Sequence, residues 1–394
     1  MKEKIGFFAI FVLFFFSSDT LSSSILSAEV VGLLTQILYV VLVLLLLLNL
    51  KNNQKNIWAG LILSLLCILV FFTAIANGEF SLGYVIQAIV LIVGYVMATK
   101  IDFRFFIDKY CQILYYLSLL SICLFFLFLS FPNLINLFPV VINVEDEEYV
   151  NLFFYVHYIN MYRNTGIFRE PGMFMVYLNI GVLFQFLFYK EIKRKYLITY
   201  SIALLTTLST GGFVVFAFLS FVYLLKSNKI KNAISFAFIF IVLCVFILSN
   251  FELFQSTFAK FDSSSNEYGS TVARISSVTV PTQIFIDSPF FGVGLSNFKD
   301  LYGSYSQDLL GFSLRADAHS TNTLFNSLGT YGFFFFIILL IGVYKFSSSL
   351  SNRNLIKILV FISLLLMLGN EDLRYSLLFS LLLFYGFVKN GLYE

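Results

Sequence analysis

Long apolar stretches recur along the whole chain, with short polar connections between most of them. A helix that crosses a bilayer needs about 20 mainly apolar residues, because the hydrocarbon layer is about 30 Å thick. The pattern predicts twelve membrane-spanning helices, at residues 5–25, 28–50, 57–76, 81–99, 110–131, 172–189, 196–209, 212–225, 232–250, 322–344, 355–369 and 373–388. The chain is therefore expected to be an all-α, polytopic membrane helical bundle.

The predicted spans at 196–209 and 212–225 are short and meet without a real loop. The residues at the junction are Ser209, Thr210, Gly211 and Gly212. A break at membrane depth is tolerated only where it lines a cavity or is buried by neighbouring helices. These two helices are thus expected either to end inside the protein or to join in a tight outer turn.

The basic residues give the orientation, because Lys and Arg collect in cytoplasmic loops. Of the 25 basic residues, 18 fall in every second connection, which places both termini in the cytoplasm. The two long connections, 132–171 and 251–321, then lie on the outer face. The seven basic residues on that face are Arg163, Arg169, Lys260, Arg274, Lys299, Arg315 and Arg374.

Composition supports a membrane protein and excludes a soluble one. Of 394 residues, 59% are hydrophobic and 12% are charged, with a mean hydropathy of +0.89. Soluble domains are about a quarter charged. Residues 1–394 are therefore expected to form a single integral membrane domain, with its soluble chemistry in the two outer loops. The four cysteines all lie in apolar runs and are expected to be apolar fillers.

The first cluster of polar residues on the outer face directly precedes an apolar span. It holds two arginines and a carboxylate, in the order Arg163, Gly166, Arg169, Glu170, Pro171 and Gly172. A guanidinium suits phosphate, since its planar fork donates two parallel hydrogen bonds and keeps its charge. The alternative is an ion pair of Glu170 with either arginine that merely orders the loop.

Two further clusters lie in the second outer loop. The first begins at Arg274 and leads to Ser288-Pro289-Phe-Phe-Gly292-Val-Gly294. The second holds Arg315, Asp317, His319 and Asn322, just before the next span. An imidazole titrates near neutrality and could take a proton from a hydroxyl, although a structural role for His319 stays equally open. The other histidine, His157, lies among tyrosines and is expected in an interfacial aromatic belt.

Some kinds of site are missing from the sequence. It has no glycine-rich nucleotide loop ending in Lys-Ser or Lys-Thr, so ATP hydrolysis is not expected. It also has no convincing outward-facing pair of carboxylates for a divalent metal. We therefore expect no metal, nucleotide or other cofactor, and no nucleic-acid partner.

The chain resembles the bacterial O-antigen polymerase and ligase superfamily of the Wzy type. Four features match in order: Arg163-x-x-Gly166-x-x-x-Glu170-Pro171, Leu208-Ser209-x-Gly211-Gly212, Arg274 leading to Ser288-Pro289-Phe-Phe-Gly292-x-Gly294, and His319 before a span with Tyr331-Gly332. Thr210 stands where many members of the superfamily have an arginine. His319 is separated from Asn322 by two residues, whereas many members have the pair adjacent.

The resemblance implies a metal-independent glycosyltransferase with the large membrane-embedded, GT-C-like architecture. The expected donor is an undecaprenyl-pyrophosphate-linked oligosaccharide at the outer face of the inner membrane, and a hydroxyl of a second repeat unit attacks it. The product would be O-antigen, capsule or exopolysaccharide, made beside a flippase and a chain-length regulator of the same pathway. The expected site residues are Arg163, Arg169, Arg274 and Arg315 for the pyrophosphate, His319 or Glu170 for the proton, and Asn322, Asp317, Ser209 and Thr210 as further candidates.

Other functions stay open at this point. A ligase would use the same donor and move a finished glycan to a lipid A core or a protein. A flippase for lipid-linked units would have a similar number of helices, but its loops are usually short on both faces. A secondary transporter would show internal repetition, which is not visible here, and a cell-wall polymerase matches the motifs less well.

The orientation gives the first prediction. Reporter fusions at residues 53, 104, 193, 228 and 350 should report the cytoplasm, and fusions at 145 and 265 the outer side, because of the uneven distribution of basic residues. An outward signal at 193, in the most basic connection, would overturn the orientation.

Overall fold

The computed structural model describes residues 2–20, 28–49, 57–142, 148–152, 154–159, 162–189, 191–227 and 269–388. Most of these residues are helical. The helices are α1 (Lys2–Phe15), α2 (Ala28–Asn49), α3 (Ile57–Ala76), α4 (Leu82–Lys100), α5 (Phe103–Ser130), α6 (Pro171–Leu187), α7 (Arg194–Thr206), α8 (Thr210–Ser227), α11 (Gly269–Asp287), α12 (Leu295–Leu310), α13 (Ala316–His319), α14 (Thr323–Ser349), α15 (Asn354–Leu368) and α16 (Leu377–Phe387).

Four helices in the described part of the chain, α3, α4, α5 and α14, are long and apolar enough to cross a membrane. Shorter apolar helices include α6, α15 and α16. These helices support a mainly helical membrane protein. The count of twelve spans stays a prediction, and the predicted span at 232–250 lies outside the described residues.

Two of the predicted span boundaries are wrong for local reasons. α5 begins at Phe103 instead of 110, because the carboxylate of Asp102 caps it and accepts the backbone N–H groups of Arg104 and Phe105 at 2.9 and 3.0 Å. α1 ends at Phe15, well before 25. After it, the hydroxyl of Thr20 donates to the carbonyl of Ser17 at 3.0 Å, which favours a turn over a continued helix.

The first long connection contains a small antiparallel sheet, which the sequence pattern did not reveal. Its order is β1 (Val140–Ile142), β2 (Glu148–Asn151) and β3 (Val156–Tyr158), and the 3₁₀ helix η2 (Pro132–Leu137) precedes it. The ring of His157 on β3 stacks on Phe128 near the end of α5, with centroids 5.1 Å apart. Burial lowers the pKa of His157. The sheet is thus anchored to the end of α5 by aromatic packing.

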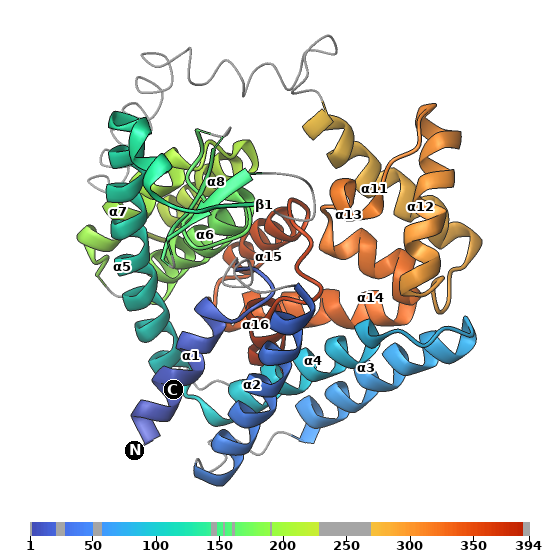
Figure 1. The fold of residues 1–394 in the computed structure, drawn as a ribbon. Helices are drawn as coiled ribbons and strands as arrows, with labels where there is room; N and C mark the ends of the chain where they lie inside the picture. Colours follow the sequence, from blue (N-terminus) through green and yellow to red (C-terminus); the bar gives the residue numbers. More distant parts are fainter. Residues whose placement is uncertain are drawn as a thin grey trace.

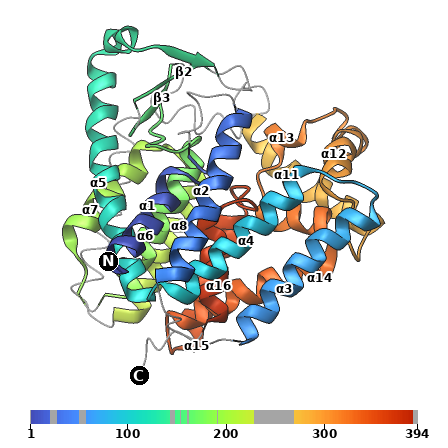
Figure 2. The ribbon, with the colours of Figure 1, turned by 60° about the horizontal axis from the view of Figure 1, so that its bottom comes forward.

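The helices form two groups with a central layer between them. Figures 1 and 2 both show α5 to α8 and the sheet on one side, and α11 to α13 on the other. α14, α15 and α16 lie between these groups, and α16 packs against α4 and α14. The connection between α15 and α16, residues 369–376, therefore reaches both groups of helices.

A kink in α14 joins two of the motifs found in the sequence. Gly332 has φ 79° and ψ −172°, a conformation essentially restricted to glycine. The segment before α12 occupies the break, where the N–H of Gly294 donates to Thr330 O at 3.0 Å and the N–H of Phe333 donates to Pro289 O at 2.9 Å. The motif at 288–294 and the motif at 331–332 are thus one structural unit, which fixes α12 on α14.

This kink gives the second prediction. Alanine at Gly332 requires the glycine-only conformation, and its Cβ would overlap the backbone of Phe290. Gly78 also has a positive φ, 65°, but its Cβ would meet nothing within 4 Å. Gly78→Ala should lose about 1–2 kcal/mol, and Gly332→Ala clearly more, in thermal unfolding of the detergent-solubilised protein. Equal losses would show that the 288–294 segment does not constrain α14.

Candidate active site

A cavity of about 800 Å³ lies where the two groups of helices face the connection between α15 and α16. Its lining includes residues from the segment before α6, from that connection, and from the start of α12. The charged lining residues are Arg163, Arg169, Glu170, Lys299, Asp300, Glu371, Asp372 and Arg374. Three of the predicted site residues, Arg163, Arg169 and Glu170, are therefore brought together.

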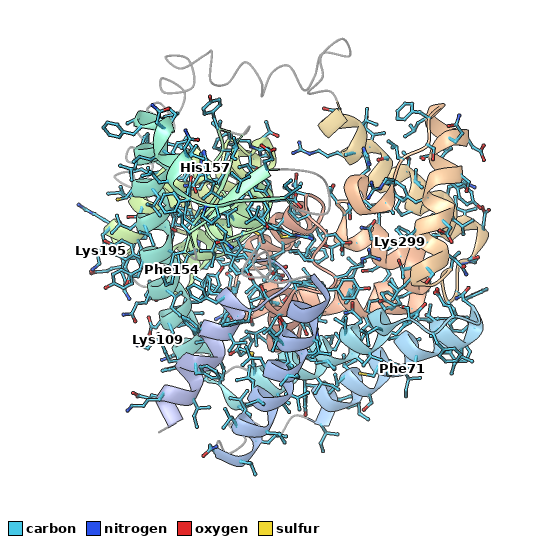
Figure 3. The ribbon with its side chains drawn as sticks, in the orientation of Figure 1. Phe71, Lys109, Phe154, His157, Lys195 and Lys299 are labelled. Carbon is cyan, nitrogen blue, oxygen red and sulfur yellow. The ribbon has the colours of Figure 1, made fainter. Side chains whose placement is uncertain are left out.

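Figure 3 shows where His157 and Lys299, from the two long connections, are placed. His157 lies with the sheet and α5, and Lys299 lies with α12 on the other side of the molecule. Lys299 lines the 800 Å³ cavity, whereas His157 lines a separate hollow of about 220 Å³ beside α5. The structure thus keeps His157 away from the arginine-lined cavity.

Arg163 and Arg169 are held by backbone carbonyls from two different elements. The Nε of Arg163 donates to Thr207 O at 3.0 Å, and an Nη of Arg169 approaches Asp372 O at 3.5 Å. The predicted ion pair between Arg169 and Glu170 is present, but its atoms are 3.8 Å apart. Among the described residues, no acceptor meets the buried Nε of Arg169. Arg169 therefore keeps donor capacity at the cavity wall.

Arg274 reaches the same region from α11. Its Nη1 donates to the hydroxyl of Thr210 at 3.1 Å, at the start of α8. The break between α7 and α8 is buried: Ser209 is 3% exposed, and Leu208 has a positive φ of 51°. Ser209 accepts the N–H of Gly212 at 3.3 Å. The geometry thus favours two helices that end inside the protein, with Thr210 facing an arginine.

Three helix N-termini meet at the connection between α15 and α16. At the start of α6, a Cβ on Gly172 would overlap the carboxylate of Glu371, and at the start of α8 a Cβ on Gly211 would overlap the amide of Asn370. At the start of α14, the backbone N–H of Thr323 donates to Glu371 O at 3.2 Å. The first N–H groups of a helix lack partners within the helix and carry partial positive charge. The start of α6 lies at the cavity wall, which Pro171 lines, and the starts of α8 and α14 pack on Asn370 and Glu371 of the same connection.

Arg374 was predicted from the sequence only as an outer basic residue, and neither it nor Glu371 and Asp372 was predicted as part of the site. Arg374 and Asp372 form a buried pair, with Nη2 2.7 Å from Oδ2. The Nη1 of Arg374 donates to Thr330 at 2.7 Å, and the amide of Asn326 donates to Asp372 at 3.1 Å. The signal for this cluster was three charges within four residues between two apolar spans.

The two neighbouring carboxyl groups have opposite pKa shifts. Burial alone would raise the pKa of Asp372, but pairing with Arg374 lowers it below its usual range. Burial, reinforced by the charge of Glu170, raises the pKa of Glu371 well above its usual range, although Arg169, Arg274 and Arg163 oppose this shift. Asp372 is therefore firmly ionised, whereas Glu371 holds a more basic carboxylate.

In the segment around His319, neighbouring residues line the cavity, and His319 itself is not among the described residues that do so. The lining neighbours include Ser320 and Thr321. The Nδ1 of His319 lies 3.1 Å from the carbonyl of Arg315. The structure thus leaves this imidazole at the edge of the site.

The other predicted residues of this segment have different surroundings. Asn322 is 4% exposed and caps α14, accepting the N–H groups of Leu324 and Phe325 at 3.0 and 3.1 Å. Arg315 is exposed and does not line the cavity. The side chain of Asp317 lies outside the described part of the structure. Asn322 therefore has a structural task that accounts for its position.

The arrangement is suited to binding an anion. Once Asp372 and Arg374 neutralise each other, three arginines, Arg163, Arg169 and Arg274, face two glutamates, Glu170 and Glu371. The helix N-termini add to this positive excess. In the part of the chain that the structure describes, no three His, Cys, Asp or Glu residues are grouped as a metal site.

Part of the chain matches a known protein family. Residues 196–340 match the family model described as O-antigen ligase. The matched region runs from α7 through most of α14 and includes Ser209, Thr210, Arg274 and His319. This match confirms the resemblance to the O-antigen polymerase and ligase superfamily. No curated protein matches the chain.

Proposed function

We propose, from the O-antigen ligase match and the arginine-lined cavity, that the protein is a glycosyltransferase that polymerises undecaprenyl-pyrophosphate-linked repeat units. The observation that carries this proposal is that Arg163 and Arg169 line one cavity beside the start of α6, with Arg274 held on Thr210 at the start of α8 and close enough to act on Glu371 at the cavity wall. A pyrophosphate needs fixed positive charge both to bind and to leave. This region supplies it from side chains and backbone together.

The proposed reaction is a direct displacement at the anomeric carbon of the donor sugar. A hydroxyl of the acceptor unit forms the new C–O bond while the C–O bond to the pyrophosphate breaks, so that the anomeric configuration is inverted. The hydroxyl proton must pass to a base, and the leaving pyrophosphate takes the bonding electrons. His319 and Glu170 are the candidates that the sequence offers for this base.

The cavity is large enough for the reacting ends of two lipid-linked substrates. A volume of about 800 Å³ lies within the usual range of ligand sites. It fits the donor pyrophosphate with the sugars beside the scissile bond, not a whole glycan. We propose that the rest of each glycan extends into the aqueous space on the outer face.

The membrane arrangement belongs to the same proposal. We place the protein in the inner membrane with twelve spans, both termini in the cytoplasm, and a GT-C-like architecture. In this orientation the cavity faces outward, since its lining comes from the two outer loops and from the outer ends of the spans. A flippase and a chain-length regulator of the same pathway would act beside it.

A ligase is the second candidate, and the description of the matching family favours it directly. Both enzymes would use the same donor and the same anion site. They differ in the acceptor, which is a growing lipid-linked unit for a polymerase and a lipid A core or protein for a ligase. Products that carry several repeat units still joined to lipid pyrophosphate would identify the polymerase.

The third prediction concerns cofactors. Purified protein given native lipid-linked repeat units, accumulated in cells that lack this protein, should extend them without added nucleotide and in the presence of EDTA. The expected reason is that arginines and helix ends, not a metal ion, neutralise the leaving pyrophosphate. Loss of extension on chelation, with recovery on adding Mg²⁺ or Mn²⁺, would contradict this prediction.

The fourth prediction concerns the arginines. Changing Arg163, Arg169 or Arg274 to Ala should weaken binding of undecaprenyl pyrophosphate roughly 10-fold to 150-fold, because each charge-assisted hydrogen bond contributes about 1.5 to 3 kcal/mol. Lysine at these positions should restore binding only in part, since an ammonium lacks the planar fork. Binding to the purified variants and polymer yield in membranes would both be measured.

Arg194→Ala is the matched control, because Arg194 is exposed at the start of α7, on the predicted cytoplasmic face. It should bind the lipid pyrophosphate like the wild type. Normal binding and polymer in all three arginine variants would leave the glycosyltransferase proposal without its main physical support.

A further inference from the structure

Glu371 is a buried carboxylate in the candidate site for which the proposed reaction so far has no use. Glu371 is 8% exposed and lines the cavity. Its backbone is fixed independently of its side chain, because the hydroxyl of Thr323 donates to Glu371 O at 2.5 Å and accepts the N–H of Leu373 at 2.9 Å. The start of α14 therefore holds this residue in place.

The carboxylate of Glu371 packs on Gly172 but has no hydrogen bond, and no ion pair within 4 Å, with the described residues. The neighbouring Asp372, by contrast, is fully engaged by Arg374, at 2.7 and 3.0 Å. A Cβ at Gly172 would overlap the Glu371 carboxylate, so the absence of a side chain at the start of α6 leaves room for this carboxylate. Two adjacent acids in one connection thus have separate roles.

The charged groups near Glu371 lie on three segments of the chain. Arg163, Arg169 and Glu170 belong to the loop before α6, and Arg274 belongs to α11. On its own connection, Asp372 is neutralised by Arg374. The three arginines that stabilise an ionised Glu371 are the same ones that we assign to the pyrophosphate. The base and the leaving group would therefore share one set of positive charges.

We propose that Glu371 accepts the proton of the attacking hydroxyl, an inference that rests on the proposed glycosyl transfer. In this step the O–H bond of the acceptor breaks and its proton moves to a carboxylate oxygen of Glu371. The hydroxyl oxygen bonds to the anomeric carbon, and the pyrophosphate leaves with the electron pair. One negative charge thus moves from Glu371 to the leaving group, while the same arginines remain close to both.

The surroundings of Glu371 make it a better base than an ordinary carboxylate. Burial, with the charge of Glu170 acting in the same direction, raises the pKa of Glu371 well above its usual range. Two carboxyl groups whose environments separate their pKa values are typical of acid and base pairs in enzymes. Since the base must be ionised to act, the reaction rate should fall as the pH falls through this raised pKa.

The two bases suggested by the sequence are placed less favourably. The side chain of Glu170 is half exposed and forms an ion pair with Arg169 at 3.8 Å. The imidazole of His319 lies beside the Arg315 carbonyl, and His319 is not among the described residues that line the cavity. Glu371 combines burial with an unengaged carboxylate at the cavity wall.

The fifth prediction separates proton transfer from donor binding. In Glu371→Gln the turnover rate should fall about 10²-fold to 10⁴-fold. Binding of undecaprenyl pyrophosphate should stay equal or become tighter, because a negative charge near the arginines is removed. The measurements are binding to the purified protein and extension of native lipid-linked repeat units across a range of pH. Glu191→Gln, an exposed change on the predicted cytoplasmic face, is the matched control and should behave like the wild type.

Glu371→Asp keeps the charge and gives a second readout. It should retain part of the activity and keep the loss of rate at low pH, with its midpoint moved, whereas the residual rate of Glu371→Gln should lose this dependence on pH. If Glu371→Gln does not fold, a wild-type pH profile in Glu371→Asp overturns the inference.

Near-normal turnover in Glu371→Gln also overturns the inference, as does loss of the low-pH limb in His319→Ala alone. These outcomes differ from failure of the proposed function, which would appear as normal binding of the lipid pyrophosphate by all arginine variants.

Discussion

The convergence of three helix N-termini on the connection between α15 and α16 is the constraint on which the site depends. Gly172 and Gly211 leave room for the side chains of Glu371 and Asn370, and Thr323 holds the backbone of Glu371. A side chain at either glycine would displace the Glu371 carboxylate or the Asn370 amide. These close contacts therefore fix the connection against α6 and α8, at one side of the cavity.

This packing also resolves an electrostatic difficulty. Charged groups within an apolar bundle are costly unless they are paired or hydrogen-bonded. Asp372 and Arg374 neutralise each other, and Thr330 and Asn326 complete their hydrogen bonds. The remaining arginines are held by carbonyls and hydroxyls at the broken ends of helices, which fixes their positions without cancelling their charge. A site of this kind is organised for an anion before the anion arrives.

Features that depend on a local sequence pattern were predicted. Features that depend on contacts between segments distant in the sequence were missed. Apolar length identified the span at 57–76, and the glycines near Ser209 identified the break between α7 and α8. The motifs at 288–294 and 331–332 were both found, but their contact at the kink of α14 required the fold. Glu371 was missed because nothing in its own connection shows that it packs on Gly172. The sheet beside Phe128 was missed because its strands are only three or four residues long.

The most direct measurement is a structure of the protein in lipid nanodiscs with bound undecaprenyl pyrophosphate. The two phosphates should lie in the 800 Å³ cavity, within hydrogen-bonding distance of Arg169 and Arg274, with the carboxylate of Glu371 beside the outer phosphate. The start of α6 and the start of α8 should point their N–H groups toward them. Phosphates bound away from this cavity, for instance beside the basic cytoplasmic loops, would contradict the central claim that the meeting helix ends form the donor site.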